Sequence, residues 1–351
     1  MDEVSGIGVD TSKRIFQLHG VDRAERVVLR RQLRRSQMAE FFARLPPTKV
    51  AMEACGASHH WARELRGLGP DVVLIAPQHA KPYVKRGKND AADAAALCEA
   101  MSRPTMRFVP VKTAEQQAAL MLANMRERLV RSRTRLANTA RGHAAEFGLV
   151  APTGPAQLSP LLARAASDPS VPALARQLFA ELAAEDAELE QRLRRIDAEL
   201  KTWFESQPVC RLLAEIPGVG PVIASMLVMK TPDPHAFRCG RDFAAWIGLT
   251  PRDHSTAGRM RLGVITRAGD ETLRSLLVVG ATSVVNRARR PGARPIPWLA
   301  RMLARKKAPK LVAVALANRI ARIAWKLMTT GEAYDPARRD AHRLSAPAAA
   351  A

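Results

Sequence analysis

Hydrophobic residues in the first eighty positions come in short runs divided by polar and small residues. Strand-like runs, which alternate or group apolar residues, occupy residues 4–20, 26–33, 49–54 and 71–77. Residues 38–45 and 59–69 carry apolar residues at helical spacing instead, and the second of these helices would end at Gly67 and Gly69. This alternation of strands and helices predicts a mixed sheet flanked by helices.

The remainder of the chain follows helical periods. Residues 113–147 are continuously helical in pattern, and the Pro- and Gly-rich residues 148–160 mark a break. A second long helix is predicted over residues 172–207. Its apolar positions recur at spacings of three, four or seven, at Leu178, Leu182, Leu189, Leu193, Ile196 and Leu200. The stripe predicts a short coiled-coil seam, although an intramolecular helical hairpin would use the same positions.

Four acidic residues in the first hundred positions are candidates for a metal site. Asp10 ends the apolar run SGIGVD, Glu53 ends a similar run in KVAMEA, and Asp90 and Asp93 lie three residues apart in KNDAADAAALCEA. A helix presents residues at that spacing on one face. Acids at two strand ends and on one helix face can converge on two Mg²⁺ ions, which prefer carboxylate oxygens and assist phosphoryl chemistry when about 3.5–4 Å apart. An RNase H-like nuclease fold places its metal ligands in this way. Ordinary surface acids are the alternative interpretation.

Two groups near these acids have both functional and ordinary interpretations. His59 and His60 follow a small-residue turn, where either could contact substrate or serve as a capping or surface residue. Basic residues crowd the segment before the acidic helix, at Lys81, Lys85, Arg86 and Lys88. A basic loop beside a metal site suits a phosphate backbone, but a solvated loop would have the same composition.

Composition narrows the class of partner. The 351 residues include 55 Lys and Arg against 33 Asp and Glu, a formal charge of +22, and 47% of them are hydrophobic. A folded protein with that charge favours a polyanionic partner, and nucleic acid is the leading candidate. A membrane is disfavoured because no apolar run approaches the ~18–20 residues that a spanning helix needs. The start of the chain lacks the basic and apolar segments of a signal peptide, and four scattered cysteines show no metal-ligand spacing, so we expect a cytoplasmic protein with reduced thiols.

Arginine is concentrated in the first long helix and in the C-terminal part. Between residues 126 and 141 the only acid is Glu127, against Arg126, Arg128, Arg131, Arg133, Arg135 and Arg141. From Gly258 to Met328, sixteen Lys and Arg face only Asp270 and Glu271. Both asymmetries favour nucleic-acid contact over a merely solvated surface.

Two motifs in the second half carry candidate chemistry. IPGVGPVIASMLV places Gly218 and Gly220 in a turn between two short helices, as a helix-hairpin-helix does to offer backbone N–H groups to a phosphate, although a tight connection would also use them. Ser255 lies in the polar loop HSTAGR beside Arg252 and Arg259, whose guanidinium groups could neutralise a phosphate that the serine attacks. A serine that merely forms a turn is the alternative.

Several motifs together resemble those of a known family. In order they are GIGVDTSK, AMEACGAS, the basic segment into KNDAADA, the helix with Asn138 and Arg141, IPGVGP, WIGLTPR and HSTAGRMRLGVITRAGD. This series, across residues 4–330, is similar to the insertion-sequence one-ten family of transposases. The resemblance implies a RuvC-like domain with a DEDD metal site at Asp10, Glu53, Asp90 and Asp93. It also implies a transposase domain with a serine nucleophile, which falls on Ser255, whereas a nucleophile at the second position of the loop would fall on Thr256.

The resemblance also implies a domain order. We expect a RuvC-like α/β domain with an RNase H-like mixed sheet, a long helical coiled-coil segment, and a mainly helical C-terminal domain with a helix-hairpin-helix. The expected parts are residues 1–110 (RuvC-like), 111–150 (arginine-rich helix), 151–208 (linker and coiled coil), 209–330 (transposase domain) and 331–351 (disordered tail).

In activity the resemblance implies an RNA-guided recombinase. A bridge RNA would pair with donor and target DNA, and a homo-oligomer, a dimer or tetramer, would join them through a phosphoserine link with Mg²⁺, or Mn²⁺ in its place. Acids from one protomer and a serine from another would form a composite site. The expected nucleic-acid contacts are Lys85, Arg86, Lys88, Arg128, Arg131, Arg135, Arg141, Gly218, Gly220, Arg252, Arg259, Arg261, Arg267 and Arg274. The alternatives are a RuvC-like nuclease that hydrolyses DNA with water, and a non-catalytic nucleic-acid-binding protein.

Overall fold

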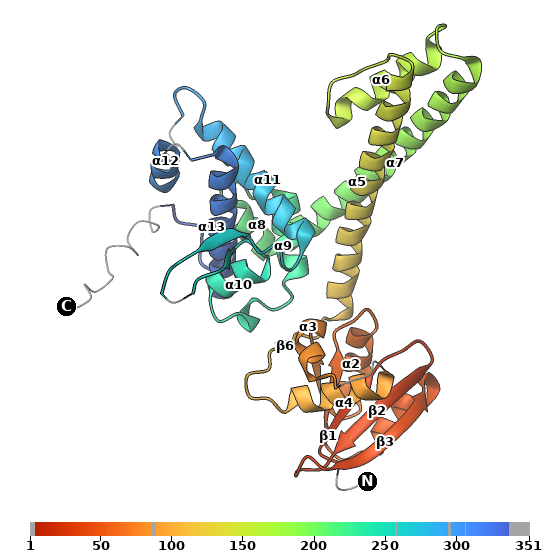
Figure 1. Ribbon diagram of the computed structural model, residues 1–351, viewed down its shortest axis with the longest axis vertical. Coiled ribbons are helices and arrows are strands. Elements are labelled where there is room, and N and C mark those ends of the chain that lie inside the picture. Colours follow the sequence, from red (N-terminus) through yellow and green to blue (C-terminus); the bar gives the residue numbers. More distant parts are fainter. Residues whose placement is uncertain (1–3, 86–88, 257, 294–295, 306, 337–351) are drawn as a thin grey trace, which may run out of the picture. The chain divides into compact units, whose positions relative to one another are not determined.

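The chain divides into two compact units, unit 1 (Met1–Ala118) and unit 2 (Ala119–Ala351), each described by itself (Figure 1). The computed structural model describes residues 4–85, 89–256, 258–293, 296–305 and 307–336. The predicted basic residues Arg86 and Lys88, and most of the predicted tail, lie outside these ranges. None of the helices in the described ranges is long and apolar enough to cross a bilayer.

Unit 1 is built on a mixed sheet. Its strands are β1 (Gly6–Asp10), β2 (Ile15–Val21), β3 (Val27–Arg34), β4 (Lys49–Glu53), β5 (Asp71–Ile75) and β6 (Phe108–Val109), in the order β3-β2-β1-β4-β5-β6. The central strands β1, β4 and β5 are parallel, and β2, β3 and β6 are antiparallel to their neighbours. Alternation in β2 buries Phe16 and Leu18 on one face, as a period of two requires.

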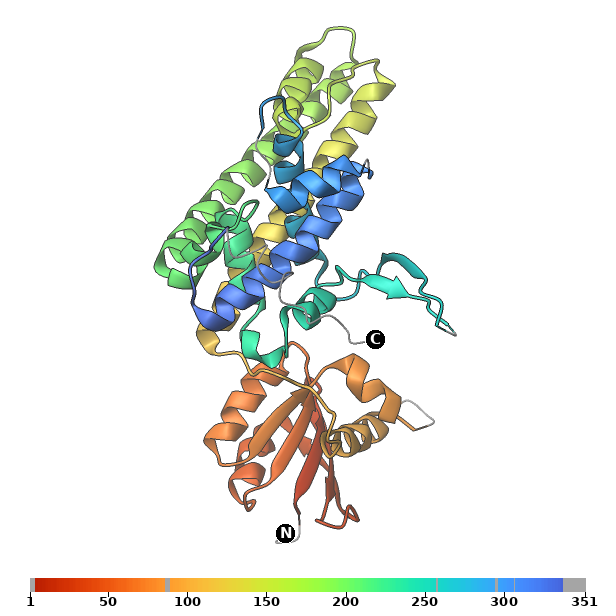
Figure 2. The same cartoon turned by 90° about the vertical axis from the view of Figure 1, so that its left-hand side faces the viewer.

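Helices cover both faces of this sheet (Figure 2). They are α1 (Met38–Ala43), α2 (Ser58–Gly67), α3 (Pro77–Ala80) and α4 (Asp90–Met101), with 3-10 turns at Arg35–Gln37 and Lys81–Tyr83. One buried cluster joins Phe16 and Leu18 to Phe42 of α1 and Trp61 of α2, and a second joins Ile75 of β5 to α4. The central strand β1 is therefore buried from both sides, which explains its almost wholly apolar run.

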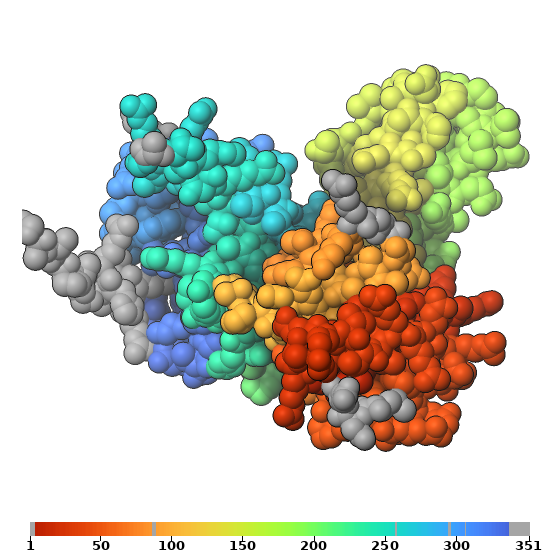
Figure 3. All heavy atoms as spheres, turned by 60° about the horizontal axis from the view of Figure 1, so that its bottom comes forward, coloured from red at the N-terminus to blue at the C-terminus, as the bar shows by residue number. Residues whose placement is uncertain are grey.

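Glycine in β1 allows α4 to lie directly on the strand. A Cβ on Gly8 would come within 2.0 Å of the Ala94 carbonyl oxygen and 2.6 Å of the Cys98 backbone nitrogen, and one on Gly6 would meet the Met101 side chain at 2.5 Å. The red and orange segments that carry β1 and α4 lie against each other in Figure 3. Since Met101 lies at Gly6 and Ala94 at Gly8, α4 runs antiparallel to β1 and its first turn lies toward the end of the strand.

Unit 2 contains a long helical hairpin with a third helix packed on it. Helix α5 (Ala114–Glu146), which begins in unit 1, is followed by a 3-10 turn at Pro155–Gln157, α6 (Leu158–Ser167) and α7 (Ala173–Ser206). Helix α6 joins α5 and α7 through a cluster with Ala140, Leu162 and Phe179. Further along, Leu129 and Leu136 of α5 pack with Leu189 of α7. Most of the apolar stripe of α7 is thus packed within this chain, whereas its first member, Leu178, is 56% exposed.

Ion pairs between α5 and α7 occupy two of the arginines considered for nucleic-acid contact. Arg133 Nε lies 2.8 Å from Asp186 Oδ1, and its Nη2 lies 3.3 Å from Glu190. Arg126 Nε lies 2.7 Å from Asp197 Oδ1. The Asp186 side chain is only 3% exposed, so its charge is compensated almost entirely by Arg133.

Replacing Asp186 by alanine is expected to destabilise the fold by about 3 kcal/mol, because it leaves the Arg133 charge in a largely buried place without its main partner. Urea denaturation followed by circular dichroism measures the change. Glu188→Ala is the matched control on the same helix, since Glu188 and its partner Arg192 are exposed and such a pair contributes less than about 1 kcal/mol. Equal losses in the two variants would contradict the structural role of the buried pair.

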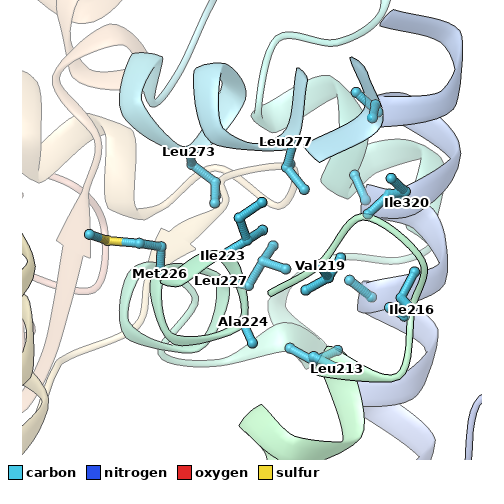
Figure 4. Packing of buried hydrophobic residues seen from close by; sticks show 14 of the residues in the cluster. Leu213, Ile216, Val219, Ile223, Ala224, Met226, Leu227, Leu273, Leu277 and Ile320 are labelled. Atoms are coloured by element: carbon cyan, nitrogen blue, oxygen red, sulfur yellow. The ribbon is translucent and has the colours of Figure 1, made fainter. Parts of the chain in front are cut away.

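The rest of unit 2 is a helical domain with one β-hairpin. Its elements are α8 (Pro208–Ala214), α9 (Pro221–Lys230), a 3-10 turn at Pro234–Ala236, α10 (Gly240–Trp246), β7 (Pro251–Asp253), β8 (Leu262–Ile265), α11 (Glu271–Ala288), α12 (Pro297–Ala304) and α13 (Pro309–Thr330). In Figure 4, Leu213 of α8, Leu227 of α9, Leu277 of α11 and Ile320 of α13 point into one common core. The prediction of a mixed α/β N-terminal part followed by a helical remainder is confirmed.

Candidate active site

The sheet and α4 place the four candidate acids at one edge of unit 1. Asp10 is the last residue of β1 and Glu53 the last of β4, and these strands are parallel neighbours, so both side chains lie at the same sheet edge. Asn89 caps α4 by accepting the Ala92 N–H at 2.8 Å, which fixes the start of the helix at Asp90. Asp90 and Asp93 are therefore both in the first turn, at the end of α4 that lies toward Asp10.

The electrostatics of Asp10 show that these carboxylates interact. Burial, followed by the charges of Asp90, Asp93 and Glu53, raises the pKa of Asp10 to about 6. Burial and the charge of Asp93 also raise the pKa of Glu53 above its ordinary value. The structure thus brings the four acids into one repelling group, while the catalytic role predicted for them stays a prediction.

The donor set suits a hard divalent cation. Four carboxylates supply only oxygen ligands, which Mg²⁺ prefers, and the repulsion that raises the pKa of Asp10 is what a bound cation would relieve. Within the described ranges, no group of three or more His, Cys, Asp or Glu side chains is already drawn together closely enough to hold an ion. The residues fit the cation in chemistry, because all four offer carboxylate oxygens.

His59 is buried in unit 1 rather than displayed at the surface. Its Nδ1 accepts the Lys112 backbone N–H at 3.2 Å, and its Nε2 lies 3.0 Å from Lys112 Nζ. Burial first, then the charges of Lys112 and Arg63, lowers the pKa of His59 to about 4. Its neighbour His60 is exposed and lies 4.0 Å from Glu64. Neither interpretation considered for His59 describes this place, because its side chain is buried and hydrogen-bonded within unit 1 rather than capping a helix or lying at the surface.

His59→Gln is expected to lower stability at neutral pH, and the deficit should shrink on acidification. The lowered pKa of His59 means that its contribution is fully present above about pH 6.5 and is lost as the pH falls toward 4. The raised pKa of Asp10 acts in the opposite direction over this window, but equally in both proteins, so the difference in Tm between wild type and variant isolates His59. Thermal unfolding at pH 7.5, 6 and 5 measures it. His60→Gln is the control, and the same pH trend in that variant would refute the assignment.

Ser255 lies in the hairpin formed by β7 and β8, which projects from the helices of unit 2 in Figure 2. Its Oγ accepts the Arg261 backbone N–H at 3.0 Å, and its own N–H donates to Asp253 Oδ1 at 2.8 Å. The hydroxyl and backbone N–H of Ser255 hold the pKa of Asp253 below its usual range. Asp253 is thus an ionised acceptor beside the serine. It was not among the predicted site residues, although an Asp two residues before a Ser is a common turn signal.

The hairpin is highly exposed. Ser255 and Thr256 are both on the surface, and Thr256 pairs with Arg259 across the tip, where the Arg259 N–H donates to the Thr256 carbonyl at 3.0 Å. The Met260 side chain is 81% exposed and that of Val264 is 67% exposed. The acids belong to unit 1 and the serine to unit 2, so the two parts of the predicted chemistry are carried by separate units.

The predicted nucleic-acid contacts in α4 and α5 differ in how free their side chains are. Lys85 is exposed and lies 4.0 Å from Glu99. On α5, Arg128 and Arg135 are exposed. Arg131 lies 2.6 Å from Glu127, and Arg141 donates to the Gly154 carbonyl at 2.7 Å.

The predicted contacts around the hairpin are mostly at the surface. Its exposed arginines are Arg252, Arg259, Arg261 and Arg267. Arg274 instead donates to the carbonyls of Ile247, at 2.9 Å, and Ala268, at 2.8 Å, so it braces the segment that leads out of the hairpin.

The two glycines of IPGVGP have different surroundings. Gly218 has a φ of +91°, and a Cβ there would approach the Gly280 carbonyl oxygen to 2.9 Å, so this glycine lets the α8–α9 turn contact α11. Gly220 is exposed, nothing would obstruct a Cβ there, and the residue directly precedes α9. Of the two, Gly220 is the one whose backbone is open to a ligand.

Comparisons with known proteins agree over both units. Residues 7–147 match a family model described as "Transposase", for DEDD transposases of the IS110 group, and residues 210–295 match the "Transposase IS116/IS110/IS902 family" model. The transposase for insertion sequence element IS1328 of Yersinia enterocolitica is 37% identical over 334 residues, which cover 95% of this chain and 99% of that protein. The Sinorhizobium fredii protein y4pF/y4sB, also named as a transposase, is 62% identical over 335 residues, covering 95% of this chain and 86% of the relative. The transposase for IS1111A of Coxiella burnetii is 37% identical over 340 residues, covering 95% and 92%.

Proposed function

Because this chain belongs to the IS116/IS110/IS902 family of insertion-sequence transposases, we propose that it cuts and rejoins donor and target DNA through a phosphoserine link at Ser255, with divalent metal bound by the four acids. The observation that carries the proposal is the group of four carboxylates at the edge of the unit 1 sheet, where burial and then the charges of the other three acids raise the pKa of Asp10 to about 6. Such a group is costly to the fold unless it binds cations. The strand order of the unit 1 sheet, which includes β3-β2-β1-β4-β5, supports a RuvC-like, RNase H-like interpretation of unit 1.

In this proposal the acids hold the metal and position the scissile phosphate. Asp10, Glu53, Asp90 and Asp93 are the residues that would bind Mg²⁺, or Mn²⁺ in its place, as DEDD transposases use divalent metal generally. When bound, the metal would supply charge stabilisation for the phosphate and for the departing 3′ oxygen. The chain's own contribution is to hold two carboxylates on rigid strand ends and two on a capped helix, so that the phosphate is fixed rather than free to rotate.

The hairpin would supply the nucleophile. Ser255 Oγ would form a bond to phosphorus as the bond between phosphorus and the 3′ oxygen breaks, and the serine proton would pass to the leaving oxygen or to solvent. Asp253, ionised and hydrogen-bonded to Ser255, would orient the hydroxyl, and exposed Arg252 and Arg259 would neutralise the phosphate. The phosphoserine ester keeps the bond energy, so attack by another 3′ hydroxyl rejoins DNA and releases the serine without ATP.

Several finer features extend the proposal. The charge of +22 supports nucleic-acid partners, and we propose that a noncoding bridge RNA supplies sequence choice by base pairing while exposed arginines hold the backbones. Helices α8 and α9, with exposed Gly220 between them, support a helix-hairpin-helix. Helices α5 and α7 would carry a coiled coil between the RuvC-like part (1–110) and the transposase part (209–330). Because acids and serine are on separate units, a dimer or tetramer could combine acids of one protomer with a serine of another.

The test is a covalent adduct. Purified protein is incubated with the RNA encoded beside its element, Mg²⁺ and end-labelled donor and target DNA, and denaturing gels are examined for DNA that migrates with protein. We expect the adduct in wild type and its loss in Ser255→Ala and in Asp10→Ala. Thr256→Ala is the matched control for the loop, and an adduct that requires Thr256 instead would move the nucleophile by one residue.

A second candidate function follows from the separation of acids and serine. Four carboxylates with two metal ions can direct water at a phosphate without a protein nucleophile, as hydrolytic nucleases do. Cleavage that leaves free ends, forms no adduct and is unaffected by Ser255→Ala would favour this metal-dependent nuclease or resolvase.

A further inference from the structure

A basic groove of unit 1, which is not used in the chemistry above, lies at the same end of the sheet as the acids, on the face covered by α1 and α2. It has a volume of about 630 Å³ and is lined by Lys13, Arg14, Ile15, Arg34, Arg35, Ser36, His60 and Trp61. We call it the Trp61 groove. Its walls come from the loop after β1, the junction of β3 with α1, and the first turn of α2.

The walls of the Trp61 groove are held by backbone pairing and ring contacts. Ile15 is paired across strands with Arg34, and the Arg35 N–H donates to the Arg14 carbonyl at 2.8 Å. Trp61 is only 6% exposed and packs edge-on against Phe16, with 5.1 Å between ring centres. The Arg35 guanidinium lies 5.0 Å above the Trp61 ring. A stacked guanidinium is held in place while its N–H groups can still reach an anion.

The charge of the groove is of one sign. Lys13, Arg14, Arg34 and Arg35 are all exposed, no acid lines the groove, and none of the four forms an ion pair with any residue in the described ranges. Some other surface arginines of unit 1 have acidic partners, as Arg26 has Asp22 at 2.8 Å. Four cations gathered without an acid repel one another, and a chain of phosphates would relieve that repulsion.

The position of the groove indicates which polyanion it binds. Lys13 and Arg14 are in the loop that begins directly after Asp10, and α2 begins five residues after Glu53. Because β1 and β4 are parallel neighbours, both loops leave the same edge of the sheet, where the acids lie. A DNA strand whose scissile phosphate lies at the acids must pass this edge, so the strand that is cut is the polyanion that this position favours.

We propose that the Trp61 groove binds the phosphodiester backbone of the DNA strand that is cut, on phosphates adjacent to the one held at the acids. The proposal rests on the proposed function for the location of the reacting phosphate. Arg35, fixed on Trp61, would contact a phosphate with its guanidinium fork, and Lys13 and Arg14 would contact the neighbouring phosphates. These contacts fix the register of the strand and carry no sequence preference, which leaves sequence choice to other parts of the complex.

The experiment measures DNA binding as a function of salt, in a buffer without divalent metal so that no cleavage occurs. The full chain is titrated against fluorescently labelled DNA, in wild type and in Lys13→Gln/Arg14→Gln. Each lost phosphate contact makes the slope of log K against log salt shallower by about 0.7–0.9, so the loss of two contacts in the double variant should reduce it by roughly 1.4–1.8. Unchanged thermal unfolding of the variant establishes that it is folded.

Arg23→Gln/Arg26→Gln is the matched control. It removes the same charge from two exposed arginines of unit 1, in the turn between β2 and β3 at the end of the sheet opposite Asp10, and should leave the slope unchanged. Equal reductions in both double variants would show an effect of net charge and overturn the proposal. The proposal would also be overturned if Lys13→Gln/Arg14→Gln reduced the salt slope for binding to labelled RNA but not for binding to DNA. If the salt slope is unchanged but wild type still forms the covalent adduct, the proposal for the groove is wrong and the phosphoserine chemistry is unaffected. If the slope is reduced as expected but no adduct forms, the groove binds DNA and the phosphoserine chemistry is wrong.

Discussion

Asp10→Asn is expected to reduce DNA cleavage by roughly 10³-fold or more while raising the Tm of the metal-free protein. The carboxylate is central to the group of acids, and losing one ligand of a metal site removes several kcal/mol of stabilisation from the reacting phosphate. The same change removes the burial of a carboxylate charge and its repulsion with Asp90, Asp93 and Glu53, which together raise the pKa of Asp10 to about 6. Activity and stability should therefore move in opposite directions, as they do where a site is strained for function.

The measurement pairs cleavage of end-labelled DNA with thermal unfolding, each with and without Mg²⁺. Added Mg²⁺ should raise the Tm of wild type, because a ligand that binds only the folded state stabilises it, and should have a much smaller effect on Asp10→Asn. Asp71→Asn is the matched control, since Asp71 is exposed at the start of β5, at the opposite edge of the sheet. A Tm that falls in Asp10→Asn, or rises equally with Mg²⁺ in both variants, would contradict the assignment of these acids.

The acids and the sheet that carries them could be predicted because their signals are local. Asp10 and Glu53 each end a short apolar run, and the spacing of Asp90 and Asp93 fits a helix face, so a few neighbouring residues determine each placement. What the sequence did not reveal is why α4 lies on β1. That contact depends on Gly8 meeting Ala94 and Cys98, more than eighty residues later in the chain, and no local pattern encodes it.

Long-range partners also explain the arginines of α5. In sequence the stretch from Arg126 to Arg141 has one acid, which favoured a nucleic-acid surface. The acids that pair with Arg126 and Arg133 are Asp197 and Asp186, on α7, which packs alongside only in the folded hairpin. An interpretation from composition counts charges within one segment, whereas the ion pairs form between segments.

The serine hairpin shows a similar limit. The hairpin pairs Pro251 of β7 with Ile265 of β8, fourteen residues later in the chain. The segments before and after the hairpin come closest at Gly248 and Gly269, where an added Cβ would lie about 2 Å from the backbone of the opposing segment. The role of Asp253 could not be predicted without this hairpin. The Ser255 N–H donates to Asp253 and the Ser255 Oγ accepts from the Arg261 N–H, and both hydrogen bonds depend on the geometry of the hairpin tip.

Gly8→Ala tests the link between packing and the acids, because Gly8 itself carries no chemistry. A Cβ at this position would lie 2.0 Å from the Ala94 carbonyl oxygen and 2.6 Å from the Cys98 nitrogen, and both are backbone atoms that move only with the helix. We expect α4 to shift away from β1, with a loss of about 1–3 kcal/mol in stability from overpacking. The shift would carry Asp90 and Asp93 away from Asp10, and a displacement of about 1 Å is enough to reduce cleavage roughly 10²-fold.

Three measurements distinguish this outcome from simple unfolding: urea denaturation, cleavage of labelled DNA at a temperature where the variant is folded, and the Tm rise on adding Mg²⁺. Gly67→Ala is the matched control, since a Cβ there meets nothing within 4 Å and Gly67 ends a helix of the same unit. A folded Gly8→Ala protein should cleave poorly and gain less from Mg²⁺, because its acids no longer converge on one cation. If it cleaves as well as Gly67→Ala, then the acids do not depend on the close contact between α4 and β1.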